Sequence, residues 1–189
     1  MGIRTMIQSL LPGKKDQEEE DDFAFLHQVS IFKGLSEEQL RKVHARMEKR
    51  TFEAGTPIMR EGDIDTDSIM YILKLGTVGI TKSVTLKVSK TETAQKEKNL
   101  IRLTGAMRPF FGEMSMFEEK GERSATVMPL DECTVFVISK KDLEELSAED
   151  PAIGYVIVTT ITRVLCDRLR KMNNDVLKLT TALSLALSK

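Results

Sequence analysis

The amino-acid sequence predicts an α+β fold, in which a small antiparallel β-roll, similar to a jelly-roll barrel, is flanked by N-terminal helices and a long C-terminal helix. Between Arg50 and Ser139, short runs rich in Ile, Val, Thr and Phe are separated by recurring glycines, which is typical of small antiparallel rolls. On both sides of this part, apolar residues recur at helical spacing. The length of 189 residues suffices for one domain with an appended helix.

Composition and charge argue against several classes of protein. Lys and Arg (28) nearly balance Asp and Glu (29), which leaves a net charge of −1 and no broad basic field for nucleic acid. No apolar run approaches the roughly 20 residues of a membrane span. The N-terminus lacks the pattern of a signal peptide, and Met6 stands where a myristoylation motif beginning at Gly2 requires Ser or Thr. Cys133 and Cys166 are expected to be isolated reduced thiols. We therefore expect a soluble, cytoplasmic protein.

Residues 1–22 are predicted to form a flexible leader. Apolar residues in its first half have helical spacing and allow a short amphipathic helix that ends at Pro12 and Gly13. The acidic run from Glu18 to Asp22 is expected to be a solvated linker. The alternative is that this leader docks on a partner or on the surface of its own domain.

The first firmly predicted helix begins at Ser36. Ser36 and Gln39 form the pattern of a capping box, and Leu35 can meet Leu40 as a hydrophobic staple. His44 lies in this helix and is expected to be packed or solvated rather than a ligand, as is His27.

The middle of the chain predicts a long hairpin and then two more helices. Val84, Leu86 and Val88 alternate as in a half-buried strand, and the polar stretch from Lys90 to Lys98 is expected to be a solvated loop. Ser139 is predicted to cap a short helix through Leu146. Asp150 and Pro151 are predicted to begin the last helix, because proline suits the first helical turn.

The last helix carries a heptad pattern of apolar residues. The repeating positions are Leu165, Leu169, Met172, Val176, Leu179 and Leu183. This pattern favours a symmetric homodimer through paired helices, and the alternative is packing of the stripe on the helix's own roll. We therefore divide the chain into the leader (1–22), the β-roll with flanking helices (23–150) and a dimerising C-terminal helix (151–189).

The stretch from Phe111 to Val127 is the candidate functional site. Gly112 and Glu113 open it with a tight backbone and a carboxylate, a short apolar turn follows, and Arg123 and Ser124 close it. Backbone N–H groups at a helix start and a guanidinium both suit an anionic phosphate. Glu113 would repel a phosphate, so we expect it to accept a hydrogen bond from a ligand hydroxyl such as that of a ribose. Together these features indicate a nucleotide, whereas the alternative is an internal Glu113–Arg123 salt bridge without a ligand.

The same stretch closely resembles the phosphate-binding cassette of the cyclic nucleotide-binding domain superfamily, of the type found in the catabolite activator protein and the regulatory subunits of protein kinase A. Phe52–Ile58 with Arg60–Asp63, and Tyr71–Val78, resemble the first hairpin of this family and the strand after it. The resemblance runs from about Phe25 to about Asn173. Several collinear motifs make it far more specific than a lone glycine motif.

The resemblance implies a role for each residue of the cassette. Arg123 would pair with the cyclic phosphate, and Glu113 would accept from the ribose 2′-hydroxyl. The implied ligand-binding set is Gly112, Glu113, Met114, Ser115, Arg123, Ser124 and Ala125, with Gly76 and Phe111 as pocket wall. Base contacts would come from Met172, Asn173 and Asn174 of the last helix, whereas for Arg168 and Arg170 a contact with the ligand and a solvated position both stay open. Cyclic AMP is favoured over cyclic GMP because Ser124 follows the arginine, where a threonine in the family often accompanies cyclic GMP.

The chain departs from the family in two places. Ala106-Met107-Arg108-Pro109 replaces the usual lead into the cassette, and the sequence does not continue into a helix-turn-helix domain. We therefore expect no DNA binding by this chain alone, no membrane contact, and a ligand signal passed to an unidentified effector protein through the last helix.

Two other classes of function are weighed against this one. A cupin-type metal enzyme needs clustered histidines and carboxylates, but His27 and His44 both precede the roll, so we expect no enzyme, no metal and no cofactor other than the regulatory nucleotide. The remaining alternatives are a degenerate domain that serves as a ligand-free dimeric scaffold, and a ligand-binding fragment of a larger regulator.

Overall fold

The protein is described here by a computed structural model, which covers residues 14–87, 93–119 and 121–188. The amphipathic helix expected before Pro12 and the end of the expected strand at Val88 lie outside these residues. The elements occur in the order α2 (Lys14–Leu26), η1 (Ser30–Phe32), α3 (Glu37–Ala45), β1 (Glu48–Phe52), β2 (Ile69–Leu75), β3 (Thr77–Lys87), β4 (Thr93–Thr104), η2 (Gly105–Met107), β5 (Phe110–Phe111), α4 (Met114–Phe117), β6 (Thr126–Pro129), β7 (Cys133–Ser139), α5 (Lys140–Glu149) and α6 (Pro151–Leu187).

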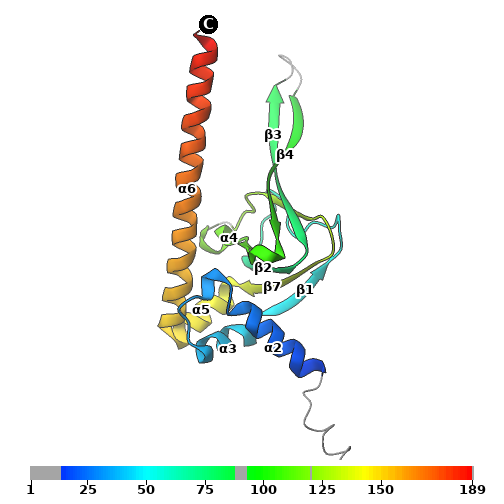
Figure 1. Ribbon diagram of the computed structural model, residues 1–189, viewed down its shortest axis with the longest axis vertical. Coiled ribbons are helices and arrows are strands. Elements are labelled where there is room, and N and C mark those ends of the chain that lie inside the picture. The colour runs from blue at the N-terminus through cyan, green and yellow to red at the C-terminus, as the bar shows by residue number, and fades with distance from the viewer. Residues whose placement is uncertain (1–13, 88–92, 120, 189) are drawn as a thin grey trace, which may run out of the picture.

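The strands form the predicted antiparallel roll. One sheet has the order β1-β7-β2-β5 and the other has the order β4-β3-β6. Helices α2, α3 and α5 and the first turns of α6 gather at one end of the roll, and α6 then runs alongside it (Figure 1). The α+β fold predicted from the sequence is therefore confirmed, and among the described strands the two sheets do not close into one barrel.

The central strands serve two cores because successive side chains of a strand point to opposite faces. On β2, Ile72 packs in a core shared with the helices, whereas Leu73 packs in a second core inside the roll. On β7, Phe136 belongs to the first core and Val135 to the second. This sheet therefore links the helical layer to the interior of the roll.

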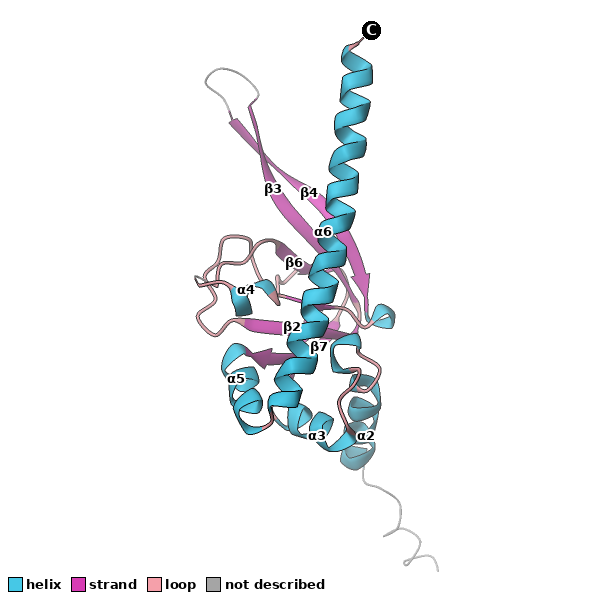
Figure 2. Ribbon diagram, turned by 90° about the vertical axis from the view of Figure 1, so that its left-hand side faces the viewer, coloured by secondary structure: helices cyan, strands magenta, loops and turns pink. Residues whose placement is uncertain are grey.

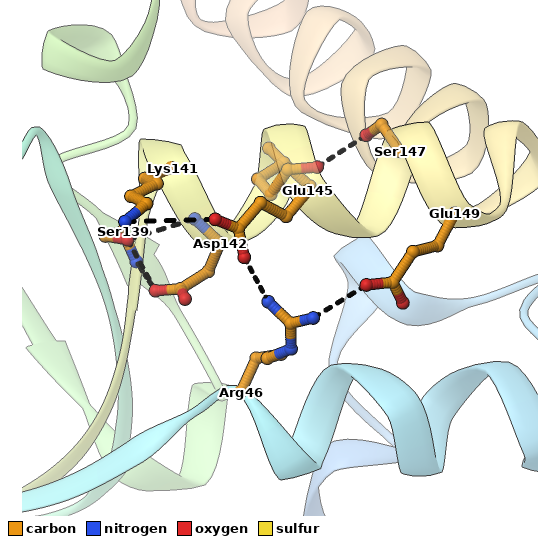
Figure 3. Close-up of polar contacts among 8 residues, drawn as sticks. Arg46, Ser139, Lys141, Asp142, Glu145, Ser147 and Glu149 are labelled. Atoms are coloured by element: carbon orange, nitrogen blue, oxygen red, sulfur yellow. Dashed lines mark hydrogen bonds and ion pairs between the residues drawn. The ribbon is translucent and has the colours of Figure 1, made fainter.

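Polar contacts fasten α3 to the junction of α5 and α6. Arg46 donates to Glu145 at 2.5 Å and to Glu149 at 2.7 Å (Figure 3). Gln39 Nε2 donates to Asp150 Oδ2 at 3.0 Å. The helices that cover the roll are thus tied together around the start of α6.

The helix starts predicted from the sequence are confirmed. Ser36 and Gln39 form the predicted capping box of α3. Ser139 caps α5 and pairs with Asp142 in a second capping box (Figure 3). Asp150 caps α6, with proline in the first helical turn.

The expectation of a solvated acidic linker holds only in part, because Glu18 to Asp21 are exposed but the run is helical and its last residue is buried. The run from Glu18 to Asp22 lies within α2, and Asp22 is buried against the ammonium groups of Lys49, at 2.8 Å, and Lys74. Burial alone would raise the pKa of Asp22, but hydrogen bonds from the two lysines outweigh it and hold the pKa below its usual value. The charge of this run has cationic partners on β1 and β2, which lie far from it in the sequence.

The expected loop between Lys90 and Lys98 is largely strand. Strands β3 and β4 pair from Thr77↔Thr104 to Lys87↔Thr93, so Thr93–Lys98 belongs to β4. The hairpin projects from the roll in the same general direction as α6 (Figures 1 and 2). Backbone hydrogen bonds form this ribbon, and they require no apolar pattern in the sequence.

Helix α6 has two distinct halves. Its first turns bury Ile153, Ile157 and Ile161 in the core shared with the other helices. Gly154 allows α5 to approach closely, because an added Cβ would lie 2.3 Å from Ser147 Oγ. The second half extends beyond the body of the domain (Figure 1). None of the helices in the described part of the chain is long and apolar enough to cross a membrane.

Candidate functional site

A cavity of about 370 Å³ lies between the cassette, strand β3 and helix α6. The sequence-predicted residues that line it are Phe111, Gly112, Glu113, Met114, Ser115, Arg123, Ser124, Ala125 and Met172. The structure thus brings the cassette and one of the predicted base contacts to a single cavity.

Arg123 is held at the back of this cavity with only 4% of its surface exposed. Its Nη1 donates to Ser115 Oγ at 3.0 Å and to the Gly112 carbonyl at 3.2 Å. Its Nη2 donates to the Ile69 carbonyl at 2.9 Å and forms an ion pair with Asp65. The guanidinium also lies 5.6 Å from the centre of the Tyr71 ring. Its position is therefore fixed from several sides by the domain itself.

The backbone and the packing at position 112 require a glycine. Its φ is +80°, a conformation that other residues adopt only with strain. A Cβ at this position would lie 2.8 Å from Arg123 Nη1 and 2.9 Å from the Ile69 carbonyl oxygen. The glycine therefore permits both the turn and the close approach of the guanidinium.

Glu113 is also buried, at 2% exposed, but its partner comes from α6. Arg168 Nη1 donates to Glu113 Oε1 at 2.5 Å, and the Arg168 side chain is 48% exposed. Arg168 Nη2 lies 3.4 Å from the Phe110 carbonyl oxygen, and the guanidinium lies 5.6 Å from the centre of the Phe110 ring. Of the two possibilities left open for Arg168, the structure therefore shows a side chain that contacts the cassette and lines the cavity.

The alternative of an internal Glu113–Arg123 salt bridge does not occur. Each of the two charges has a different partner, Asp65 for Arg123 and Arg168 for Glu113. Both groups line the same cavity. The arrangement can present a cationic and an anionic group to one ligand.

The rest of the wall is largely apolar and was missed by the sequence analysis. Met59, Ile80 and Val127 contribute apolar surface, and Lys82 and Glu122 complete the described lining. Ile80 and Lys82 are two residues apart on β3, so strand alternation would have placed them on one face. No sequence pattern pointed to Met59 or to Asp65, which lie in the connection between β1 and β2.

Three sequence-predicted residues do not line the cavity. Gly76 lies in the turn between β2 and β3 with a φ of +89°, and a Cβ there would lie 2.4 Å from the Glu132 carbonyl oxygen. Its glycine therefore serves the turn. Asn173 and Asn174 are exposed on α6. No group of three or more His, Cys, Asp or Glu within the described residues could hold a metal ion.

Comparison with known proteins identifies the fold. Residues 49–150, more than half of the chain, match the model of the family described as the cyclic nucleotide-binding domain. The chain belongs to this family.

Relatives of known function span more sequence than this chain. The cAMP-activated global transcriptional regulator Vfr of Pseudomonas aeruginosa is 31% identical over 142 residues, which are 72% of this chain and 58% of Vfr. The cyclic AMP receptor protein of Thermus thermophilus is 24% identical over 135 residues, 71% of this chain and 56% of that protein. Glutaminase 1 of Bradyrhizobium diazoefficiens is 28% identical over 151 residues, which are only 22% of its length. The matches to the first two thus span just over half of those proteins.

Solved structures of cyclic nucleotide-binding domains share the fold. A domain from Methylobacillus flagellatus has a TM-score of 0.67 at 20% identity, covering 85% of this chain and 83% of that chain. The catabolite activator protein of Thermus thermophilus has a TM-score of 0.65 at 22% identity, covering 80% and 63%. The regulatory domain of Toxoplasma gondii protein kinase A, solved with cAMP, has a TM-score of 0.60 at 20% identity, covering 79% and 52%.

Proposed function

We propose that this chain is a cyclic nucleotide receptor module, with cyclic AMP favoured over cyclic GMP, that passes ligand binding to a partner protein through α6. The observation that carries the proposal is that Arg123 and Glu113 line one cavity without neutralising each other. The cavity volume of about 370 Å³ falls within the ~300–1,000 Å³ common for small-molecule sites.

The phosphate is assigned to the Arg123 end of the cavity. A guanidinium has five N–H donors, and the four on Nη1 and Nη2 have protein acceptors. A phosphate can use the remaining Nε–H or replace the neutral Ser115 hydroxyl as acceptor, and the charge-assisted hydrogen bond is the stronger one. Backbone N–H groups around Met114 and Ser115 would complete the phosphate's shell.

The sugar is assigned to Glu113. Oε1 accepts from Arg168, and a carboxylate has capacity for further donors, such as a ribose hydroxyl. Arg168 also offsets the negative charge of Glu113, which would otherwise repel the nearby phosphate. The apolar side chains of Met59, Ile80 and Met172 can then cover the base.

The preference for cyclic AMP rests on Ser124 and on the relatives. Ser124 lines the cavity directly after Arg123, with its Oγ 3.6 Å from Met114 Sδ. The names of Vfr and of the Thermus receptor both specify cyclic AMP.

Titration calorimetry with cyclic AMP and cyclic GMP tests this proposal. We expect micromolar binding to the wild type and a loss of about a hundredfold or more in Arg123→Ala, since each charge-assisted hydrogen bond contributes about 1.5–3 kcal/mol. Arg123→Lys keeps the charge but not the fork geometry, so a folded Lys variant that binds poorly supports phosphate recognition. Equal heats from wild type and both variants would refute the assignment. If neither nucleotide gives heat with the wild type, the ligand-free scaffold becomes the better interpretation.

Transmission through α6 is supported by two of its side chains at the cavity. Arg168 binds Glu113, and Met172 forms part of the wall. A nucleotide that contacts these groups differently in two positions of α6 would shift the balance between those positions, by no more than its difference in affinity.

A homodimer through α6 is the second part of the proposal. Leu165, the first residue of the seam, packs against the chain's own core. The other seam residues, Leu169, Met172, Val176, Leu179 and Leu183, are 57–71% exposed in the single chain. The heptad register also continues backwards to Tyr155 and Val158, which are exposed as well. The apolar seam therefore extends over more heptads than the sequence analysis counted, which favours a paired helix.

Light scattering on seam variants tests the dimer. Leu179→Glu with Leu183→Glu places carboxylates in the seam, and we expect a monomer because like charges would face each other there. Leu177→Glu is the matched control, because Leu177 is equally exposed but lies outside the seam. A dimer that survives the double change, or that Leu177→Glu abolishes, would refute pairing through this face.

The remaining sequence-based expectations stay predictions. These are the cytoplasmic location, the absence of DNA and membrane binding, and the division at residues 22 and 150. The structure adds that α2 begins at Lys14 and that the first turns of α6 share the domain core.

A further inference from the structure

An open groove of about 450 Å³ lies where the end of α2, the segment after η1 and the turn η2 meet. Its lining is His27, Gln28, Phe32, Lys33, Gly34, Leu35 and Arg108. None of these residues lines the nucleotide cavity. The groove is therefore a separate feature, which the proposed ligand site does not use.

The groove is basic. Lys33 and Arg108 contribute two permanent positive charges, and the imidazole of His27 lines the same groove. No carboxylate is among the described residues that line it. Within the described parts of the chain, neither Lys33 nor Arg108 forms an ion pair, and Arg108 Nη2 instead donates to the neutral Gln28 Oε1 at 2.6 Å. Both charges therefore remain uncompensated by their immediate surroundings.

The backbone holds Arg108 in an uncommon conformation. Its φ is +48°, which is rare for a residue with a side chain. Its N–H donates to the Gly105 carbonyl at 2.9 Å, and the bond to Gln28 fixes the other end of the residue. The groove wall also contains the apolar side chains of Phe32 and Leu35. A cation held in place in a groove with apolar wall residues suits a peptide that carries both acidic and apolar residues.

The groove also lies next to the cassette and to α6, to which the proposed function assigns ligand binding and signalling. Arg108 is two residues before Phe110, whose carbonyl faces Arg168 of α6. On the other side, Phe32 shares a core with Ile157 of α6, and a Cβ on Gly34 would lie 3.7 Å from Val156. A molecule bound in the groove would therefore contact segments that connect to the cassette and to α6.

We propose that this groove docks an acidic segment of a partner protein, with carboxylates on Lys33 and Arg108 and an apolar side chain against Leu35. Charge complementarity carries this choice. The identity of the partner as the receiver of the nucleotide signal rests on the proposed function, whereas binding in the groove does not require a nucleotide.

The test uses the full chain labelled with ¹⁵N and a synthetic peptide, acetyl-Glu-Asp-Leu-Glu-Asp-Glu-amide. We expect amide shifts at residues 27–35 and 105–108, and none with the matched peptide in which Gln and Asn replace Glu and Asp. Lys33→Glu combined with Arg108→Gln should weaken binding by about tenfold or more. Lys141→Glu, a charge reversal at an exposed lysine of α5, should leave the affinity unchanged.

Several results would overturn the proposal. These are an absence of shifts in the groove, equal affinity of wild type and the double variant, or the same shifts from inorganic phosphate or from phosphatidylserine vesicles. Calorimetry with cyclic AMP on the same samples separates the two hypotheses. Peptide binding without nucleotide binding would refute the proposed function and leave the groove assignment standing.

Discussion

Arg123 and Arg168 face the same cavity but are held in opposite ways. Arg123 comes from the cassette, is almost fully buried and has four acceptors on neighbouring segments. Arg168 comes from α6, is half exposed and holds Glu113 through one short contact. The first arginine is thus part of the domain's interior, whereas the second fastens a helix to it.

Under the proposed function, this difference separates ligand binding from signalling. A group fixed from several sides can offer a ligand the same geometry at all times, which keeps the cost of organising the site low. Arg168 is half exposed and makes one contact with Glu113 at the edge of the cavity, so water or a ligand can replace it more easily than it can replace Arg123. We therefore expect Arg123 to determine affinity and Arg168 to determine how α6 responds.

The largest expected difference between the two arginines is in the stability of the fold. Arg123→Ala leaves the carboxylate of Asp65 without its guanidinium in a partly buried position, which should cost about 3–5 kcal/mol of unfolding free energy. Arg168→Ala leaves the buried carboxylate of Glu113 without its guanidinium, but Glu113 lines the cavity, where water can replace this partner, so the cost should be smaller, about 1–2 kcal/mol. Urea unfolding of the two variants measures both values, and similar losses would contradict the comparison.

A smaller effect follows from displacing Arg123 without removing it. Gly112→Ala strains a backbone at φ +80° and puts a Cβ 2.8 Å from Arg123 Nη1. We expect a loss of about 1 kcal/mol in stability from the backbone and about tenfold in nucleotide affinity from the displaced guanidinium.

Gly55→Ala is the matched control for this change. Gly55 has a φ of +81° and nothing within 4 Å of an added Cβ. It should lose similar stability without any loss of affinity. If Gly55→Ala also weakens nucleotide binding, backbone strain rather than contact with Arg123 is responsible.

The smallest effect is expected for Arg168→Gln. This change removes the charge that offsets Glu113, so nucleotide affinity should fall about two- to fivefold at low salt. Because Arg168 is half exposed, the difference from wild type should shrink as salt rises to about 1 M. Calorimetry at two salt concentrations measures it, and a loss as large as that of Arg123→Ala would remove the distinction drawn above.

Much of the fold and the cassette could be predicted from the sequence because local patterns specify them. Capping boxes such as Ser36 with Gln39 involve residues three apart, and Gly112 to Ser124 lie within one short stretch. The roll follows from glycine-punctuated strands, each of which carries its own pattern.

What the sequence did not predict depends on contacts between distant residues. Asp65 behind Arg123 and Arg168 beside Glu113 are separated from their partners by 58 and 55 positions. The acidic run was predicted to be a linker because Lys49 and Lys74 are not its neighbours in the chain. The strand at Thr93–Lys98 carries no apolar alternation, so no pattern in the sequence indicated its pairing with β3.

The close contact between Gly154 and Ser147 lies in the first turn of a helix of 37 residues. At 1.5 Å per residue this helix is about 55 Å long, and its far end lies beyond the body of the domain. A tilt of α6 by about 5° at its first turn would therefore move its C-terminal end by about 5 Å. A tilt too small to disturb the packing of the first turn would thus move the far end of α6 far enough for a neighbouring molecule to detect.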